Sequence, residues 1–313
     1  MLIRVNGRSE LTIPRIGVAL SGGGLRGLAH IGVLAELERA GIPIHFIAGT
    51  SAGAVVAALH ATGHGSQEMT ELAHELNLHD LIDAKFSLNQ LVKYGMKWLF
   101  TGKFRLLSVI PAGMIKGERV EQYFRSLWGN RTVKETKLPL AITAVDLNTA
   151  ETVFFTTLLR QKPDILHAKY DHSISLIEAV RASISIPGIF QPKVYQGMTL
   201  VDGAVKNNLP ADILRSMGAE VVLGVDLGYD GQPNFGIQSV GEVLLQCIEI
   251  MSREVTLLKG RQLSDLVIRP QTFDLTFRSV KDIDRCIERG RAATKSDLPD
   301  IITLLNDKIK QKL

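Results

Sequence analysis

The sequence predicts an α/β fold built on parallel strands, and residues 1–62 carry the main observations. Two apolar runs, at 15–20 and 44–48, each end in a glycine-containing turn, and a helical pattern follows each turn, at 28–39 and up to about residue 61. Mostly apolar runs of this length are typical of parallel strands that are buried on both faces. The order strand, loop, helix, strand, turn, helix therefore predicts a parallel pair joined by a right-handed crossover.

Length and composition fit a globular protein. The chain has 313 residues, of which 45% are hydrophobic and 22% charged, and we expect a single domain over 1–313. The formal net charge of +4 is too small to predict nucleic-acid binding, but it suits a protein that contacts an anionic surface. Cys247 and Cys286 match no Cys-x-x-Cys pattern, which favours a reducing compartment.

The sequence shows no recognisable targeting or spanning segment. The first residues lack a long apolar core with a small-residue cleavage site, and no uninterrupted apolar run reaches about 18 residues. We therefore expect a cytoplasmic protein, either soluble or peripheral on the inner face of the membrane.

The rest of the chain continues the α/β pattern. Asn207 or Asn208 is expected to cap a helix that has Pro210 in its first turn. The motif-bearing core should cover about 15–226, and 237–313 should be mainly helical. Further helices are predicted at 67–78, 118–128, 175–183 and 238–258, with one or two more near the C-terminus, and strands at 138–145, 151–157, 198–201, 220–226 and 266–268.

Residues 84–117 have an unusual composition. They contain no Asp or Glu, and six Lys or Arg residues alternate with aromatic and long aliphatic side chains. This mixture is typical of a segment that lies on an anionic lipid interface. A lid or insertion whose apolar side joins the core would show the same composition, so the segment is predicted to be lid, anchor or core.

The turn Gly49-Thr-Ser51-Ala-Gly53 matches the Gly-x-Ser-x-Gly nucleophile elbow between a strand and a helix. Such a turn holds the serine in a strained, exposed conformation, and the flanking backbones approach so closely that only small residues fit. The Ser51 hydroxyl would then lie at a helix N-terminus, where developing negative charge is favoured. The alternative is a serine that only caps the helix.

The first glycine loop is a candidate oxyanion hole. Consecutive glycines expose backbone N–H groups without side-chain obstruction, and the loop lies at the carboxyl end of the strand next to the elbow. A guanidinium would add positive charge nearby. The residues concerned are Gly22, Gly23, Gly24, Leu25 and Arg26.

The same loop also fits a nucleotide-binding pattern, Gly22-x-Gly24-x-x-Gly27. The acidic residue expected about 20 positions further on is absent, and 48–50 reads Ala-Gly-Thr instead. The loop also lacks the Gly-Lys-Ser/Thr of a phosphate-binding P-loop. Nucleotide binding is therefore the weaker alternative.

The histidines do not predict a Ser-Asp-His triad. None lies after His172, and His30 is expected to be a packing or hydrogen-bonding residue. His60 lies too far along the elbow helix to reach Ser51. His74 and His79 are five apart, so their rings point about 140° from each other around a helix and predict no metal site.

An aspartate can act as the base when it is desolvated and close to the serine. Three aspartates follow predicted strands, where parallel sheets place their chemistry: Asp146, Asp202 and Asp226. Asp202 is preferred because the Gly-Ala that follows it allows a tight turn. For each of the three, a helix cap or a loop hydrogen bond is the alternative.

Four motifs in order make the pattern more specific. They are Gly22-Gly-Gly-Leu-Arg-Gly27, Gly49-Thr-Ser-Ala-Gly53, Ala182-Ser-Ile-Ser-Ile-Pro187 with Phe190 and Pro192, and Asp202-Gly-Ala204 with Asn207-Asn208. In this order they resemble the bacterial patatin-like phospholipase family, over roughly 15–226. The sequence has Asp-Gly-Ala where Asp-Gly-Gly is also common in the family.

The resemblance implies a three-layer α/β/α fold and hydrolysis of acyl lipids. It also implies a dyad without histidine, in which Ser51 is the nucleophile, Asp202 the base and the 22–24 loop the oxyanion hole. No cofactor or metal is expected, and the partner is a phospholipid or another acyl lipid, with membrane contact through 84–117. The alternative is a lipid-binding or regulatory protein that keeps the fold without catalysis.

Overall fold

The structure is a computed structural model that describes residues 13–77, 113–157, 165–228, 240–275 and 280–312, together with positions 81, 83, 159 and 237. Most of the predicted lid-or-anchor segment therefore lies outside the described residues, and only its end, 113–117, is described.

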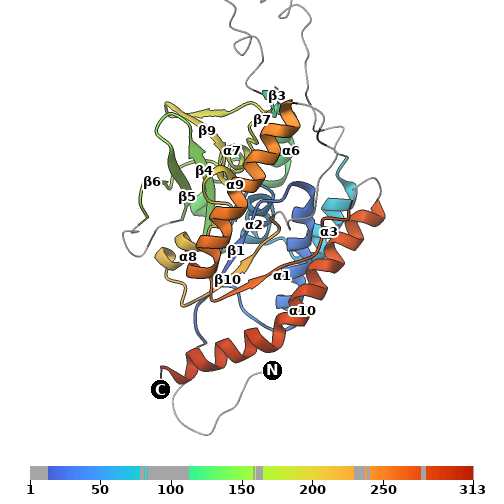
Figure 1. The fold of residues 1–313 in the computed structure, drawn as a ribbon, viewed down its shortest axis with the longest axis vertical. Helices are drawn as coiled ribbons and strands as arrows, with labels where there is room; N and C mark the ends of the chain where they lie inside the picture. Colours follow the sequence, from blue (N-terminus) through green and yellow to red (C-terminus); the bar gives the residue numbers. More distant parts are fainter. Residues whose placement is uncertain are drawn as a thin grey trace, which may run out of the picture.

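Among the described residues, a nine-stranded, mostly parallel sheet runs through the middle of the molecule (Figure 1). Its main path has the order β11-β10-β1-β2-β4-β5-β6, and the β8–β9 pair joins it at β4. A separate pair, β3 (Gly113–Ile115) with β7 (Gly188–Phe190), lies beside it. The strands of the large sheet are β1 (Ile16–Leu20), β2 (Phe46–Thr50), β4 (Leu140–Asp146), β5 (Glu151–Thr156), β6 (Ala168–Asp171), β8 (Lys193–Tyr195), β9 (Met198–Asp202), β10 (Val221–Val225) and β11 (Leu266–Ile268).

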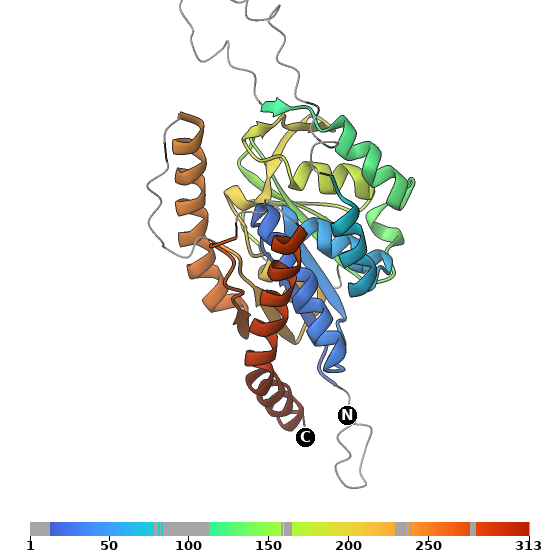
Figure 2. The same ribbon diagram turned by 90° about the vertical axis from the view of Figure 1, so that its right-hand side faces the viewer.

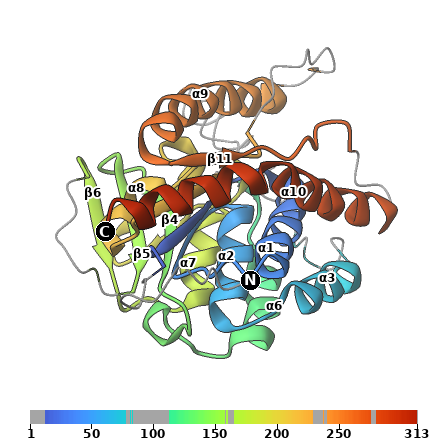
Figure 3. The same ribbon diagram turned by 90° about the horizontal axis from the view of Figure 1, so that it is seen from below.

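Helices cover both faces of this sheet, which confirms the predicted three-layer α/β/α fold. On one face α2 and α7 pack on the strands, and α10 packs along α1; on the other face α8 packs on β1, β2 and β10, with α9 beside it. Figures 2 and 3 show α9 on the opposite side of the molecule from α3 and α6. The helices are α1 (Ala29–Arg39), α2 (Ala52–Thr62), α3 (Ser66–Glu75), α6 (Glu118–Trp128), α7 (Leu176–Ser183), α8 (Ala211–Met217), α9 (Val240–Leu263) and α10 (Val280–Lys310).

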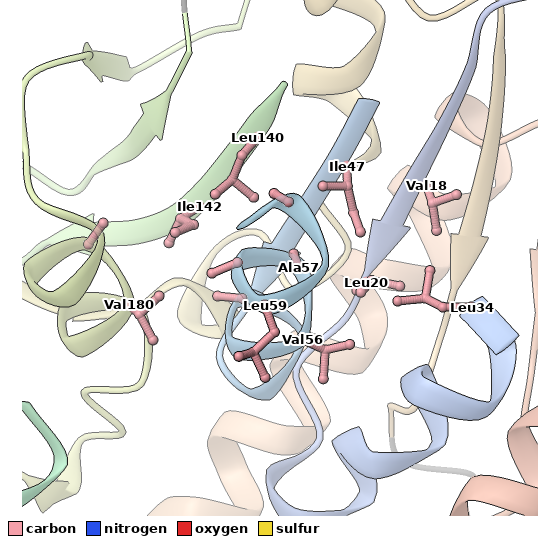
Figure 4. Close-up of a cluster of buried hydrophobic side chains, with 14 of the residues drawn as sticks. Val18, Leu20, Leu34, Ile47, Val56, Ala57, Leu59, Leu140, Ile142 and Val180 are labelled. Atoms are coloured by element: carbon pink, nitrogen blue, oxygen red, sulfur yellow. The ribbon is translucent and has the colours of Figure 1, made fainter. Parts of the chain in front are cut away.

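The two faces of β1 explain why its sequence is apolar throughout. Val18 and Leu20 point into the core between the sheet and α1 and α2, whereas Ala19 points to the core under α8. Successive side chains of a strand alternate between faces, so a strand covered on both sides needs apolar residues at every position. Figure 4 shows Val18 and Leu20 with Ile47 of β2 beneath the helices of the larger core.

One topological detail positions the site. The first half of β4 pairs in parallel with β2, which ends where Thr50 lies opposite Thr143. The second half of β4 pairs antiparallel with β9, which ends where Asp202 lies opposite Ala144. The carboxyl ends of β2 and β9 therefore meet on the same edge of β4, at adjacent positions.

Most of the predicted elements are found, with boundaries shifted by a few residues. The strand at 266–268 and the helix at 118–128 have the predicted bounds, and the last helix is one long α10 that contains Pro299. The short strands β3, β6, β7 and β8 were not predicted. No helix in the part of the chain that the structure describes has the length and apolarity to cross a membrane.

Candidate active site

Ser51 occupies a sharp turn between β2 and α2. Its backbone has φ 55° and ψ −125°, a conformation that a residue with a side chain rarely adopts. The flanking glycines are needed for space, because a Cβ on Gly53 would lie 2.3 Å from the Leu20 carbonyl oxygen and one on Gly49 would lie 2.3 Å from the Gly53 oxygen. The predicted elbow geometry is therefore present.

The Ser51 hydroxyl lies close enough to the Asp202 carboxylate to lower its pKa, although the two residues are 151 positions apart (202 − 51). Both residues are buried, and the carboxylate also accepts the Ala204 N–H at 2.8 Å. Burial raises the pKa of Asp202 to about 7, while the nearby Ser51 hydroxyl and the hydrogen bond from the Ala204 N–H oppose part of that rise. A carboxylate with this pKa accepts a proton near neutral pH far more readily than an exposed aspartate does.

The tight turn after Asp202 depends on Gly203, as the sequence suggested. A Cβ at this position would lie 2.5 Å from the carbonyl oxygen of Thr143, on the neighbouring strand β4. The close approach keeps the end of β9 against β4 and directs the Asp202 carboxylate toward the elbow.

The last residue of α7 and the residues that follow it hold both members of the pair through their backbones. The Ser51 N–H donates to the Ser183 hydroxyl at 2.9 Å, and that hydroxyl donates to the Thr143 carbonyl at 2.7 Å. Two residues later, the Ser185 carbonyl accepts the Asp202 N–H at 2.9 Å. This short segment thus fixes the elbow and the end of β9 relative to each other. Sequence reasoning used these serines only as part of a motif and assigned them no role.

The glycine loop lies against the elbow, since a Cβ on Gly22 would be 3.1 Å from the Ser51 Cβ. The Gly22 N–H is not available to an oxyanion, because it donates to Asn208 Oδ1 at 2.9 Å, and the Arg26 N–H donates to the Gly23 carbonyl. Within the described residues, the N–H groups of Gly23, Gly24 and Leu25 have no protein acceptor. The set of candidate donors is therefore narrower than the sequence predicted.

The same contact corrects the expected helix cap. Pro210 precedes α8, and no side chain caps this helix. Asn208 binds the Gly22 amide instead, and the Asn207 amide group donates to Asp212 at 2.9 Å. The asparagine pair braces the glycine loop and the start of α8 rather than capping α8.

The two other strand-end aspartates have structural partners. Asp226 pairs with Arg253 at 2.5 Å and with Arg269 at 3.4 Å. Burial by itself would raise the pKa of Asp146, but the backbone N–H groups of Asn148 and Thr199 and nearby hydroxyl and ammonium groups outweigh it and keep the pKa below its usual value. The loop hydrogen bond expected as an alternative thus describes Asp146, whereas Asp226 forms ion pairs that the sequence did not predict.

His30 is a buried hydrogen-bonding residue, as expected. Its Nε2 lies 2.8 Å from the Ser21 carbonyl oxygen, beneath the glycine loop, and burial lowers its pKa to about 4. Among the described histidines, none forms a hydrogen bond to Ser51. In the same part of the chain, no group of His, Cys, Asp or Glu side chains is arranged to hold a metal ion.

A cavity of about 450 Å³ opens above Ser51 and Asp202, and most of its lining is apolar. The apolar lining includes Ile186 and Ile189, which follow α7, and Leu245 and Ile248 of α9. The i, i+3 spacing on α9 could have indicated a buried face, but the sequence carried no signal for what that face covers.

The cavity rim carries an arginine held by three contacts. The Arg26 guanidinium stacks over Phe273 at 4.0 Å, lies 3.3 Å from Glu249, and donates to the Gly23 carbonyl at 3.2 Å. The predicted positive charge beside the glycine loop is thus present and oriented.

Comparisons with known proteins agree with this fold. Two solved structures match nearly all of the chain at low identity, so they speak for the fold alone. VipD from Legionella pneumophila has a TM-score of 0.53 and 16% identity, and the match covers 92% of this chain and 67% of that one. A human GIVD cytosolic phospholipase A2 has a TM-score of 0.52 and 14% identity, with coverage of 100% and 62%.

The family follows from sequence. The family model described as patatin-like phospholipase matches residues 18–215, a range that includes both Ser51 and Asp202. The chain therefore belongs to the patatin-like phospholipase family.

The curated proteins that this chain matches are longer than the chain itself. An uncharacterized NTE family protein of Mycobacterium tuberculosis is 31% identical over 241 residues, which are 74% of this chain and 55% of that protein. The patatin-like phospholipase domain-containing protein 6 of Mus musculus is 31% identical over 222 residues, or 70% of this chain and 14% of that one. The chain thus spans about half the length of the first relatives it matches.

Proposed function

We propose that the protein hydrolyses carboxylic esters of lipids, with Ser51 as nucleophile and Asp202 as base. The observation that carries this proposal is that Ser51 and Asp202 interact while both line one cavity, where burial raises the pKa of Asp202 to about 7. Family membership supports an acyl lipid as the substrate.

The first half of the reaction forms an acyl-enzyme. Ser51 Oγ attacks the ester carbonyl carbon while its proton moves to Asp202. The carbonyl oxygen becomes an oxyanion that accepts hydrogen bonds from the N–H groups of Gly23 and Gly24, and each such donor is typically worth about 3 kcal/mol. The tetrahedral intermediate then collapses, and Asp202 returns the proton to the leaving alcohol.

The second half releases the fatty acid. Water gives a proton to Asp202 and attacks the acyl carbon, and the proton returns to Ser51 Oγ as the ester to the serine breaks. One carboxylate therefore handles both proton transfers, which suits a pKa near the working pH.

The test uses Ser51→Ala and Asp202→Asn, with hydrolysis of medium-chain p-nitrophenyl esters as the readout. Both variants should lose turnover while keeping wild-type circular dichroism. Asp146→Asn is the matched control, because Asp146 is also a buried aspartate at a strand end, but its carboxylate binds the turn that follows β4 and does not line the cavity. Wild-type turnover by either dyad variant would refute the mechanism.

A covalent probe separates catalysis from lipid binding. A fluorophosphonate should label wild-type protein at Ser51, and peptide mass spectrometry would locate the adduct. If wild-type protein binds vesicles but neither turns over esters nor reacts with the probe, the non-catalytic lipid-binding alternative is favoured. Mass spectrometry of the products formed from mixed phospholipids would identify the head group and acyl position.

A further inference from the structure

Arg181 lies in the last turn of α7, and its side chain is buried, with an exposed fraction of 2%. Taking a cation out of water costs free energy unless a carboxylate or several hydrogen-bond acceptors compensate for it. Burial lowers the pKa of Arg181, and the charges of Glu121 and Asp83 oppose part of that change. Within the described residues, however, all of its side-chain hydrogen bonds go to a hydroxyl or to backbone carbonyls, and none to a carboxylate.

The guanidinium of Arg181 contacts three places along the chain. Its Nη1 donates to the Ser185 hydroxyl at 2.7 Å. Its Nη2 donates to the Gln191 carbonyl at 2.9 Å and to the carbonyl of Lys116, the residue after β3, at 2.5 Å. The planar fork of an arginine can make such contacts at the same time, whereas a lysine ammonium cannot span them. One side chain thus holds both ends of residues 185–191, called here the 185–191 segment.

The 185–191 segment contributes to the cavity above the proposed nucleophile. Its residues Ile186, Pro187 and Ile189 belong to the cavity lining. Inside the segment, the Ile186 carbonyl accepts the N–H groups of Ile189 and Phe190 at 3.1 and 3.0 Å. The Phe190 ring also lies 5.0 Å from the Arg181 guanidinium. The guanidinium therefore supports a part of the chain that an acyl group in the cavity would contact.

The first residue of the 185–191 segment is also tied to the proposed base. The Ser185 carbonyl accepts the Asp202 N–H at 2.9 Å. The Ser185 hydroxyl accepts from the Arg181 guanidinium and donates to the Arg181 carbonyl at 2.9 Å, so this residue is fixed from both directions. The apolar lining and the backbone anchor of Asp202 are thus held through the same arginine.

We propose that Arg181 is a positioning residue that orders the 185–191 segment and thereby sets the preference of the site for long acyl chains. The inference rests on the proposed function, because it takes an acyl ester as the substrate. A long chain makes more contact with the apolar lining than a short chain does. If the segment had to become ordered during binding, a long chain would therefore lose more binding free energy than a short one.

Three variants test the role of the guanidinium. Arg181→Gln removes it, and Arg181→Lys keeps the charge without the planar fork. Ser185→Ala removes one acceptor but keeps the backbone carbonyl that binds Asp202, so it carries the test if Arg181→Gln does not fold. Arg215→Gln is the matched control. Arg215 is partly buried and also donates to a backbone carbonyl, that of Glu220 at 3.0 Å, but it does not line the cavity.

The first measurement is the ratio of kcat/KM for a decanoyl ester to kcat/KM for a butanoyl ester. Both values come from one preparation, so a smaller folded fraction lowers them equally and leaves the ratio unchanged. The ratio should fall about fivefold or more in Arg181→Gln, because a loosened lining discriminates chain length less well. It should fall less in Arg181→Lys and Ser185→Ala, and it should stay at the wild-type value in Arg215→Gln.

The second measurement is hydrogen exchange followed by mass spectrometry, which does not depend on catalysis. Peptides that cover the 185–191 segment should exchange faster in Arg181→Gln and in Ser185→Ala than in wild type. Peptides from β1 should exchange at the wild-type rate in both variants, because Arg181 does not contact that strand.

Each outcome bears on a different part of the proposal. Equal loss of activity toward both esters would make Arg181 a residue that only stabilises the fold, and would overturn its role in chain-length preference. Wild-type exchange of the 185–191 segment in the Arg181 variants would show that the guanidinium does not order it. If wild-type protein hydrolyses neither ester while the variants show the faster exchange, the proposed function fails, and the ordering role of Arg181 remains supported.

Discussion

Ester hydrolysis should slow about tenfold between pH 8 and pH 6, because the proposed base then becomes protonated. Burial raises the pKa of Asp202 to about 7. With that pKa, roughly nine-tenths of Asp202 is ionised at pH 8 and roughly one-tenth at pH 6, and only the ionised form can accept the Ser51 proton. The profile of kcat/KM should therefore rise with unit slope and bend near pH 7.

The assay needs a substrate without titrating groups over this range. A neutral medium-chain ester meets that condition, and the released acid should be quantified by chromatography so that ionisation of a chromophore does not enter. Circular dichroism must be recorded at each pH, so that activity lost through unfolding is not attributed to protonation of Asp202.

A flat profile between pH 5 and pH 8, or a bend near the ordinary aspartate value of about 4, would refute this assignment of the base. An imidazole could also produce a bend near pH 7, and His30→Gln tests that explanation. Glutamine keeps an N–H donor for the Ser21 carbonyl, which His30 Nε2 contacts in the structure. The bend should stay near pH 7 in this variant.

Three further predictions follow from the same contacts. First, the folded-state pKa of Asp202 lies above the unfolded value, so its contribution to stability is complete below about pH 4 and is lost as the pH rises through about 7. At about 1.4 kcal/mol per pH unit, Asp202→Asn should raise the free energy of unfolding at pH 8 by up to about 4 kcal/mol, measured by urea titration, and no gain would contradict the buried charge. Second, Gly53→Ala should destabilise the fold by more than about 2 kcal/mol, because the alanine Cβ would lie 2.3 Å from the Leu20 carbonyl oxygen. An unchanged Tm would show that the elbow has more space around position 53 than the structure indicates. Third, Ser183→Ala leaves the buried Ser51 N–H without its acceptor, which costs about 1–3 kcal/mol. This variant should lower kcat more than it raises KM, whereas Ser183→Thr should retain most of the wild-type kcat. Equal effects of the two variants on kcat would rule out a positioning role for Ser183.

The parts of the site that the sequence predicted are those set by local backbone chemistry. The elbow around Ser51 requires small residues at fixed spacing, so a five-residue motif is enough to predict its geometry. Gly203 works in the same way, since the turn after β9 leaves no room for a side chain. The fold class was equally accessible, because strands buried on both faces must be apolar throughout.

The parts that the sequence did not predict depend on distant partners. A strand at 198–201 was expected, but the pattern does not specify that β9 enters antiparallel beside the second half of β4, which is what brings Asp202 to Ser51. Asn208 has the local signature of a helix cap, and a glycine loop 186 residues away takes its side chain instead. Tertiary contacts override local preference at these positions because a buried N–H must find an acceptor.

Ser51 has a backbone conformation, and Asp202 a buried charge, that an unfolded chain would avoid. The residues around them must therefore be rigid. A positive φ at a serine and a charge in a buried carboxyl both cost free energy, so each persists only where neighbouring contacts over-determine it. The Ser183–Ser185 segment meets this need with one hydrogen bond to each partner's backbone, at 2.9 Å in both cases. Because both bonds come from one short piece of chain, a shift of the elbow relative to β9 would stretch at least one of them. The distance between nucleophile and base is thus set by contacts to the backbones of Ser51 and Asp202. The two side chains themselves do not have to fix it.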